Sequence, residues 1–180
     1  MKGEINNYFR NIESKVATTY KTAERARKKG FDPESSISVP LAKNMAERVE
    51  GLISALIPDI IDSGLSDRIQ ELEKNHGKLN PLVALSISLE VAHEKFCKFE
   101  NRIKAMEAGI RVGLAYLTLG VVSSPLEGFV ELKLKKRKDG KEYFCLMYSG
   151  PIRSAGGTAG ALSVVIADHI RKNMGYDAYD

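Results

Sequence analysis

The sequence predicts an α+β fold in which a mainly helical N-terminal part is followed by a β-hairpin and a C-terminal helix. Between residues 4 and 121 the large apolar side chains recur at steps of three and four, which is the helical period. From Val130 the pattern changes to strict alternation, which is the period of a strand. An Asp139-Gly140 pair separates two alternating runs, and this dipeptide is a strong hairpin signal.

The composition indicates an ordinary globular chain and excludes several classes of protein. The 180 residues are 43% apolar and 28% charged, which fits one domain or two small ones and argues against a disordered tail. No run approaches the roughly 18 apolar residues of a membrane span, and the N-terminus lacks the apolar core of a secretory signal. We therefore expect a cytoplasmic protein with no membrane partner.

The first predicted element is an amphipathic helix over residues 4–29. Its apolar stripe is narrow and the rest of its surface is polar, so the helix must lie against the body of the protein or a partner. Gly30, preceded by basic residues, is well placed to end it. The candidate partner-binding residues are Ile5, Tyr8, Phe9, Ile12, Val16 and Tyr20.

The segment FDPESSISVP, residues 31–40, predicts a boundary because it holds two prolines and three serines. The predicted organisation is an N-terminal helix and linker over residues 1–36 and an α+β domain over residues 37–180. Further helical faces follow over residues 41–57, 65–72, 81–96 and 103–121, separated by proline, glycine and asparagine.

The predicted hairpin has two unlike strands. In the first, Val130, Leu132 and Leu134 alternate with charged residues, whereas residues 143–148 are apolar on both faces. We therefore expect the second strand to be the more deeply buried. A glycine-rich loop, GPIRSAGG at residues 150–157, then leads into a final helix over residues 158–174.

The basic residues concentrate at this hairpin. Residues 128–141 hold six basic and two acidic side chains, a net charge of +4 that equals the net charge of the whole chain. Such a turn can contact a nucleic-acid backbone without recognising its sequence. The alternative is an edge strand whose lysines only prevent aggregation. The basic residues are Lys133, Lys135, Lys136, Arg137, Lys138 and Lys141.

The glycine-rich loop suggests a second contact with nucleic acid, through Arg153, Gly156, Gly157 and Thr158. Free N–H groups at a helix N-terminus attract anions, glycines permit close approach, and Thr158 can cap the helix. The spacing matches neither a Walker A loop nor GxGxxG. A tight turn that allows close helix packing, with no ligand, is the alternative. A small phosphate-handling enzyme built on this loop is a more remote hypothesis.

The sequence indicates no catalytic or metal-ligating set. His93 and Cys97 lie at i and i+4 of a predicted helix, but the pattern is HExxC rather than HExxH and offers no further ligand. With only Cys97 and Cys145 present, a four-cysteine zinc site is excluded, and we expect no disulfide framework. We expect no catalytic residue and no cofactor in these 180 residues.

Several segments, in order, resemble the N-terminal region of the large subunit of archaeal DNA polymerase D, also called DNA polymerase II. The most distinctive is GPIRSAGGTAGALSVVIADHIR at residues 150–171. The others are YFRNIESKVATTYKTAERARKKGFDP at 8–33, VPLAKNMAERVEGL at 39–52 and VSSPLEGFVELKLKK at 122–136.

This resemblance implies a part in template-directed DNA synthesis. It implies a heterodimer with a small exonuclease subunit, and Mg²⁺ and Zn²⁺ in the full-length enzyme, whose catalytic aspartates and zinc cysteines lie far downstream. The chain then corresponds to a non-catalytic N-terminal module that supports binding of primer-template DNA and subunit assembly. The first helix has the small subunit or a second copy of this chain as its implied partner, and the remainder of the large subunit is a further partner of the module. The alternative is an assembly module with no DNA contact.

Overall fold

The computed structural model describes residues 2–31, 41–118, 128–155 and 157–179 of the chain. The chain forms two compact units, Met1–Leu41 and Ala42–Asp180. The predicted boundary between residues 36 and 37 falls outside the described residues and stays a prediction.

In the described residues of the first unit the chain forms helix α1 (Lys2–Lys28), as the apolar period predicts. Gly30 follows with a φ of 74°, a left-handed conformation that glycine adopts without steric cost. The Gly30 N–H donates to the Arg27 carbonyl at 2.9 Å and the Phe31 N–H to the Ala26 carbonyl at 3.0 Å. The prediction that Gly30 ends the helix is confirmed.

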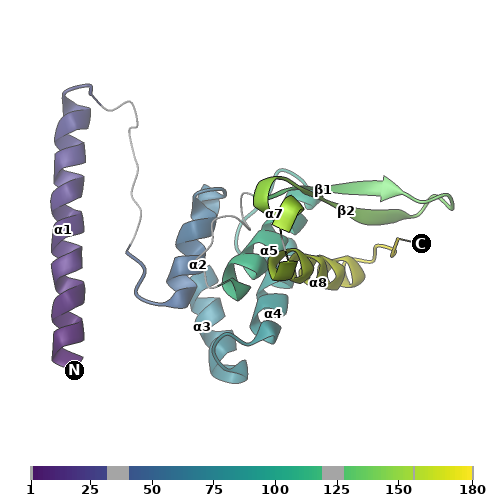
Figure 1. Cartoon of the computed structure of the whole chain (residues 1–180), viewed down its shortest axis with the longest axis horizontal. Helices are drawn as coiled ribbons and strands as arrows, with labels where there is room; N and C mark the ends of the chain where they lie inside the picture. Colours follow the sequence, from purple (N-terminus) through teal and green to yellow (C-terminus); the bar gives the residue numbers. More distant parts are fainter. Residues whose placement is uncertain (1, 32–40, 119–127, 156, 180) are drawn as a thin grey trace. The chain divides into compact units, whose positions relative to one another are not determined.

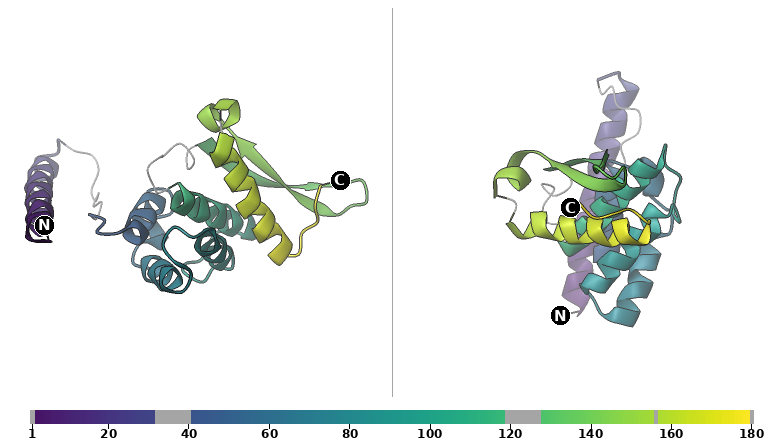
Figure 2. Two further views of the ribbon diagram at one scale, coloured as in Figure 1. Left: turned by 60° about the horizontal axis from the view of Figure 1, so that its bottom comes forward. Right: turned by 90° about the vertical axis from the view of Figure 1, so that its right-hand side faces the viewer.

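The second unit is a helical body that carries a hairpin and a last helix (Figures 1 and 2). This α+β order is the predicted one. Its elements are α2 (Met45–Ser54), a short 3-10 helix (Pro58–Ile60), α3 (Leu65–His76), α4 (Pro81–Ala92), α5 (Arg102–Leu117), β1 (Phe129–Lys136), β2 (Glu142–Tyr148), α7 (Gly150–Ala155) and α8 (Gly157–Asn173).

Asparagine side chains begin three of these helices. Asn44, Asn80 and Asn101 each accept a hydrogen bond from a backbone N–H in the first turn of α2, α4 and α5, at 2.9 to 3.0 Å. Such caps satisfy N–H groups that have no partner inside the helix. The cap at Asn44 explains why α2 begins at Met45, four residues later than the apolar pattern predicts.

Helix α5 lies between two apolar clusters and is buried on both sides. Ala108, Val112 and Tyr116 face the first cluster, which α2, α3 and α4 complete. Met106, Ile110 and Leu114 face the second, to which β1 and α8 contribute. The sequence predicts only the second of these two faces, because alanines and a tyrosine make up much of the first.

The packing of α5 on α4 depends on two glycines. A Cβ atom at Gly109 would lie 2.4 Å from the backbone oxygen of Ser88, and one at Gly113 would lie 2.0 Å from the Ser88 Oγ. Both distances are far below van der Waals contact, so only glycine permits this approach. The Ser88 hydroxyl is fully buried and donates to the Ala84 carbonyl at 2.6 Å.

An ion pair also joins neighbouring helices of this body. Arg68 on α3 donates to both carboxylate oxygens of Glu90 on α4, at 2.7 to 3.2 Å. The guanidinium lowers the pKa of the Glu90 carboxyl below its ordinary value, chiefly through these hydrogen bonds. Bidentate, charge-assisted hydrogen bonds of this kind fix the relative orientation of the two helices.

The hairpin has the predicted antiparallel register, with Leu132 opposite Leu146 and Leu134 opposite Phe144. The prediction that the second strand is the more deeply buried is confirmed only in part, because four of the eight residues of β1 are exposed but the two most deeply buried side chains also lie on β1. The fully buried side chains, Phe129 and Leu132, belong to β1, whereas β2 is half-buried on both faces from residue 143 to 148. The reason is that β1 lies directly against α5, and β2 forms the other edge of the sheet.

Two further predictions are corrected by the structure. Residues 150–157 are not a continuous loop, because α7 (Gly150–Ala155) forms a helical turn and Gly157 already begins α8, so Thr158 lies inside the first turn rather than capping it. Helix α4 ends at Ala92, before His93 and Cys97. Glu94 adopts a φ of 57°, which ends the helical path there.

The close packing of α4 and α5 makes a prediction about stability. Gly109→Ala should lower the free energy of unfolding by about 1 to 3 kcal/mol, because the Ser88 carbonyl on the backbone of α4 must move. Urea denaturation followed by far-UV circular dichroism measures the change.

Gly51→Ala is the matched control. Gly51 also lies inside a helix, but nothing lies within 4 Å of a Cβ at this position, so the change should stabilise by up to about 1 kcal/mol. Equal effects of the two alanines would contradict the packing argument.

Candidate nucleic-acid and partner interfaces

The hairpin is fixed to the body through the outer edge of β1. Glu107 of α5 is 5% exposed and accepts the Leu132 N–H at 2.8 Å. One turn later, Arg111 donates to the Val130 carbonyl at 2.9 Å, with its guanidinium 4.8 Å from the centre of the Phe129 ring. These two side chains form hydrogen bonds with backbone groups on the edge of β1 where no neighbouring strand is present. They thereby position the hairpin on α5.

The register places the basic side chains of the hairpin on both faces. Glu131, Lys133 and Lys135 share one face, opposite Met147, Cys145 and Tyr143 of β2. Lys136 lies on the other face, beyond the apolar pair of Leu134 and Phe144 and opposite Glu142. Lys138 belongs to the turn. The hairpin projects beyond the helices, so its tip presents charge in several directions (Figures 1 and 2).

Three of the six predicted basic residues are engaged with carboxylates. The Lys133 ammonium lies 2.8 Å from Glu131, a bond that raises the pKa of this lysine. Arg137 and Lys141 lie 3.2 Å and 3.4 Å from Asp139 and Asp177. Within the described part of the chain, no ion pair or hydrogen bond engages the other three side chains, which are exposed. These are Lys135, Lys136 and Lys138.

The C-terminal residues brace the tip of the hairpin. The Asp177 N–H donates to the Glu142 carbonyl at 3.1 Å, and Arg137 donates to the Ala178 carbonyl at 2.9 Å. The rings of Tyr143 and Tyr179 lie 4.9 Å apart. The guanidinium of Arg137 is therefore held in place, whereas the three exposed lysines have no such partner among the described residues.

The second predicted contact surface is only partly assembled. Arg153 on α7 is exposed, and Gly157 and Thr158 are exposed at the start of α8, while Gly156 lies outside the described residues. Gly150 and Gly157 have φ values of 52° and 42°, which favour glycine whether or not an anion is bound. Ile152 anchors α7, since a Cβ at Gly128 would lie only 2.8 Å from its side chain. An anion contact here stays a prediction.

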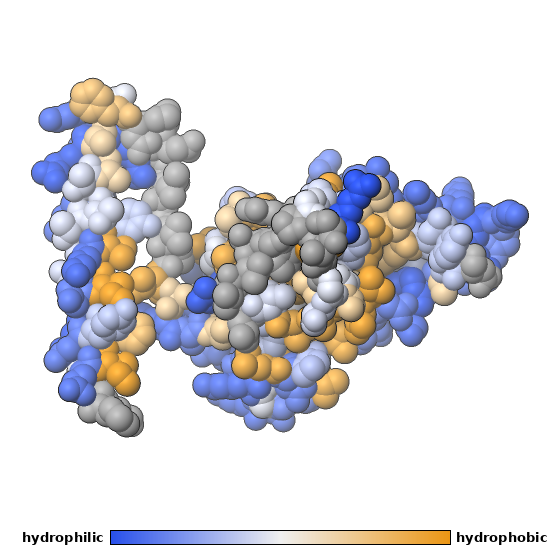
Figure 3. Space-filling view, viewed as in Figure 1, coloured by the Kyte–Doolittle hydropathy of each residue, from blue (hydrophilic) through white to orange (hydrophobic). Residues whose placement is uncertain are grey.

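The predicted partner face of α1 exposes large apolar side chains, and Figure 3 shows apolar residues in orange along this helix. Ile5, Tyr8 and Phe9 are 52%, 63% and 44% exposed, and the rings of Tyr8 and Phe9 lie 5.7 Å apart, edge to face. Ile12, Val16 and Tyr20 continue the same face and are half-buried. Exposed aromatic side chains grouped on one helix face are typical of a protein-binding surface, but that role too stays a prediction.

No metal or nucleophile site emerges from the described residues. They bring together no group of three or more His, Cys, Asp or Glu side chains that could hold a metal ion. Because α4 ends at Ala92, His93 and Cys97 do not share a helix face as predicted, and the His93 ring bonds to the Leu89 carbonyl. Burial raises the pKa of the Cys97 thiol, which makes it a poor nucleophile.

Sequence reasoning missed Glu107 and Arg111, the two residues that fix the hairpin. Both lie in the apolar period of α5, where a charged side chain needs a partner. Their spacing of four residues, facing a predicted strand, is the signal that could have revealed them.

The described helices include none that is long and apolar enough to cross a membrane.

The fold and the surface define a class of molecule, namely a helical body that carries a positively charged hairpin. Comparison with known proteins identifies the family within this class. The sequence profile of the family described as "DNA polymerase II large subunit DP2, N-terminal" matches residues 7–180. This match covers the helical body, the hairpin and the C-terminal helix together.

Individual relatives are similar over nearly the whole chain. The DNA polymerase II large subunit of Nanoarchaeum equitans is 44% identical over 173 residues, which are 96% of this chain and 14% of the relative. Those of Methanococcus maripaludis (strain C5) and Pyrococcus furiosus are 43% and 40% identical over 97% and 98% of this chain, and 15% and 13% of the relatives. The chain belongs to the family of archaeal DNA polymerase II large subunits, as their N-terminal region, and spans about a seventh of their length.

The fixing of the hairpin makes a second prediction. Glu107→Ala should lower the free energy of unfolding by about 1 to 3 kcal/mol, because it leaves the buried Leu132 N–H without an acceptor. Glu107→Gln keeps an acceptor oxygen and should cost less. Urea denaturation and amide hydrogen exchange at Leu132 measure both effects. Unchanged exchange at Leu132 in the alanine variant would contradict the proposed fixing.

Proposed function

We propose that these 180 residues form a non-catalytic N-terminal module of the polymerase large subunit, which contacts DNA through the hairpin and supports subunit assembly through α1. The observation that carries the proposal is the group of three exposed lysines, Lys135, Lys136 and Lys138, that no described carboxylate engages. Phosphate groups of DNA are the ligands that suit unpaired lysines at the end of a projecting hairpin best.

The shape of the hairpin supports a contact with the DNA backbone rather than with base sequence. The three lysines lie on different faces and positions of the hairpin, and flexible ammonium groups act as point charges rather than as forks that select a base. Arg137, the one guanidinium at the tip, is already held by Asp139 and the Ala178 carbonyl. The module would therefore position a duplex without selecting its sequence.

The chemistry of synthesis belongs to the full-length enzyme in this proposal. The partners are primer-template DNA, the remainder of the large subunit and a small exonuclease subunit, and the setting is the cytoplasm. The described residues do not supply a ligand set for the Mg²⁺ and Zn²⁺ expected of the whole enzyme. As the resemblance implies, the proposal assigns these metals to other parts of the large subunit.

A second candidate function is a pure assembly module with no DNA contact. The exposed face of α1 favours this function, because Ile5, Tyr8 and Phe9 form an apolar surface whose contact with water is unfavourable. In that case the hairpin lysines serve solubility and discourage pairing of strand edges between molecules.

Replacing the three exposed lysines tests the DNA contact. The triple variant Lys135→Ser, Lys136→Ser and Lys138→Ser should bind a labelled primer-template about tenfold or more weakly, and the slope of log affinity against log salt should become shallower by about 2 to 3. Fluorescence anisotropy at several salt concentrations measures both quantities.

With magnesium and deoxynucleotides, the 180-residue chain should not extend the primer.

The matched control removes the same charge from the helical part of the same unit. Lys43, Lys74 and Lys78 are exposed, lie outside the hairpin and carry no ion pair among the described residues. Their replacement by serine should change affinity and salt slope little. If both triple variants bind equally, or if the unaltered chain does not bind, the assembly function gains and the DNA contact is wrong.

A change on α1 tests the assembly role. Tyr8→Glu with Phe9→Glu should weaken association with the small subunit, or with a second copy, by about tenfold or more, because exposed aromatic side chains dominate such contacts. Analytical ultracentrifugation of the large subunit, alone and mixed with the small subunit, measures this.

The control for α1 places the same charge on the opposite side of the helix. Asn7→Glu with Ser14→Glu changes two exposed polar residues and should leave association unchanged. Undiminished association of the Tyr8 and Phe9 variant would show that α1 is not the docking helix.

A further inference from the structure

The two edges of the hairpin differ in how they are satisfied. Glu107 and Arg111 cover the outer edge of β1. On β2, the Glu142 carbonyl points outward to the Asp177 N–H, so the backbone groups of Leu146 and Tyr148 point the same way, because alternate residues share a direction. Among the described residues only Asp177 pairs with this edge, at Tyr143.

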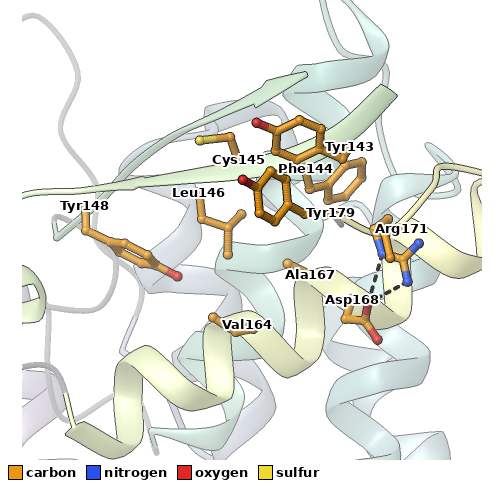
Figure 4. Close-up of a pocket in the computed structure, with 11 residues that line it drawn as sticks. Tyr143, Phe144, Cys145, Leu146, Tyr148, Val164, Ala167, Asp168, Arg171 and Tyr179 are labelled. Carbon is orange, nitrogen blue, oxygen red and sulfur yellow. Dashed lines mark hydrogen bonds and ion pairs between the residues drawn. The ribbon is translucent and has the colours of Figure 1, made fainter. Parts of the chain in front are cut away.

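Beside the open edge lies an apolar groove of about 550 Å³ between β2 and α8. Figure 4 shows Leu146 and Tyr148 pointing from β2 toward α8, which carries Val164 and Ala167, whereas Cys145 points away. Val164 is 53% exposed. Asp168 and Arg171, bonded to each other at 2.7 Å, provide a polar margin.

We propose that an extended segment from the remainder of the large subunit occupies this groove as a third strand, hydrogen-bonded to the outer edge of β2. This inference rests on the proposal that the 180 residues work within a longer large subunit. A strand beside β2 would turn every second side chain toward α8, so the segment carries apolar residues at alternate positions. These residues would cover Val164 and Ala167.

The length of the relatives favours a segment of the same subunit as the occupant. The matched relatives hold 85 to 87% of their length outside the region similar to this chain. Residues 177–179 already lie at this edge, since Asp177 pairs with β2 and Tyr179 lines the groove. A tethered segment binds at a high effective concentration, which a separate chain does not have.

Charge disfavours a second copy of this chain as the occupant. Pairing of two β2 edges would bring two hairpins together, each with a net charge of +4 over residues 128–141. Like charges on neighbouring strands destabilise their pairing.

Hydrogen exchange at single amides tests the proposal, by NMR for the 180-residue chain and by mass spectrometry with electron-transfer fragmentation for the full-length large subunit. The amides of Leu146 and Tyr148 should exchange about tenfold or more slowly in the full-length subunit. Those of Cys145 and Met147, which face β1, should be protected in both. Equal exchange of Leu146 and Tyr148 in the two proteins would overturn the proposal.

Substitutions at two neighbouring valines test whether the segment binds in this groove. Val164 lines the groove and Val165, 57% exposed, does not. Val164→Lys in the full-length subunit should abolish the extra protection of Leu146, whereas Val165→Lys should not. Equal effects of the two variants would overturn the assignment to this groove.

Two outcomes would point to another occupant. Protection that requires the small subunit, or that grows with the concentration of the 180-residue chain, would overturn the assignment to the same subunit. DNA binding by the hairpin, measured on the same samples, should not differ between the two valine variants. A failed docking proposal is thereby distinguished from a failed DNA contact.

Discussion

The close approach of α4 and α5 is the constraint on which the rest of the second unit depends. At Gly109 and Gly113 the two backbones lie so near that a single methyl group would collide with Ser88. This proximity allows α5 to be enclosed on both sides, with the helical cluster on one and the hairpin and α8 on the other. Glu107 and Arg111 project from this closely packed helix and hydrogen-bond to the backbone of β1.

The sequence predicts most of the fold because the periods of its apolar residues are long and regular. It fails where tertiary contacts decide. The apolar pattern carries α4 on to Phe96, but Glu94 adopts a left-handed conformation and its carboxylate bonds to the Phe99 N–H at 3.0 Å, so the chain turns away after Ala92. Residues 150–155 form a helical turn because Ile152 is buried against Gly128, a contact across 24 residues that no local pattern records.

The candidate site shows the same division. The basic tip of the hairpin can be located from composition alone, and the pairing of Lys133 with Glu131 follows from their shared face. Which of the other residues are engaged cannot be predicted locally, because Asp177 and the Ala178 carbonyl come from the far end of the chain. Local pairing with Glu131 and Asp139, together with the distant Asp177, leaves three of the six basic side chains without a carboxylate partner among the described residues.

The attachment of the hairpin has a mechanical consequence. Glu107 and Arg111 lie one turn apart and hold consecutive outward groups of β1, so the hairpin cannot swing about a single bond. A force applied at the tip would therefore reach α5 as a torque. Because the close packing at Gly109 and Gly113 resists movement of α5 against α4, the helical body would rotate together with the hairpin.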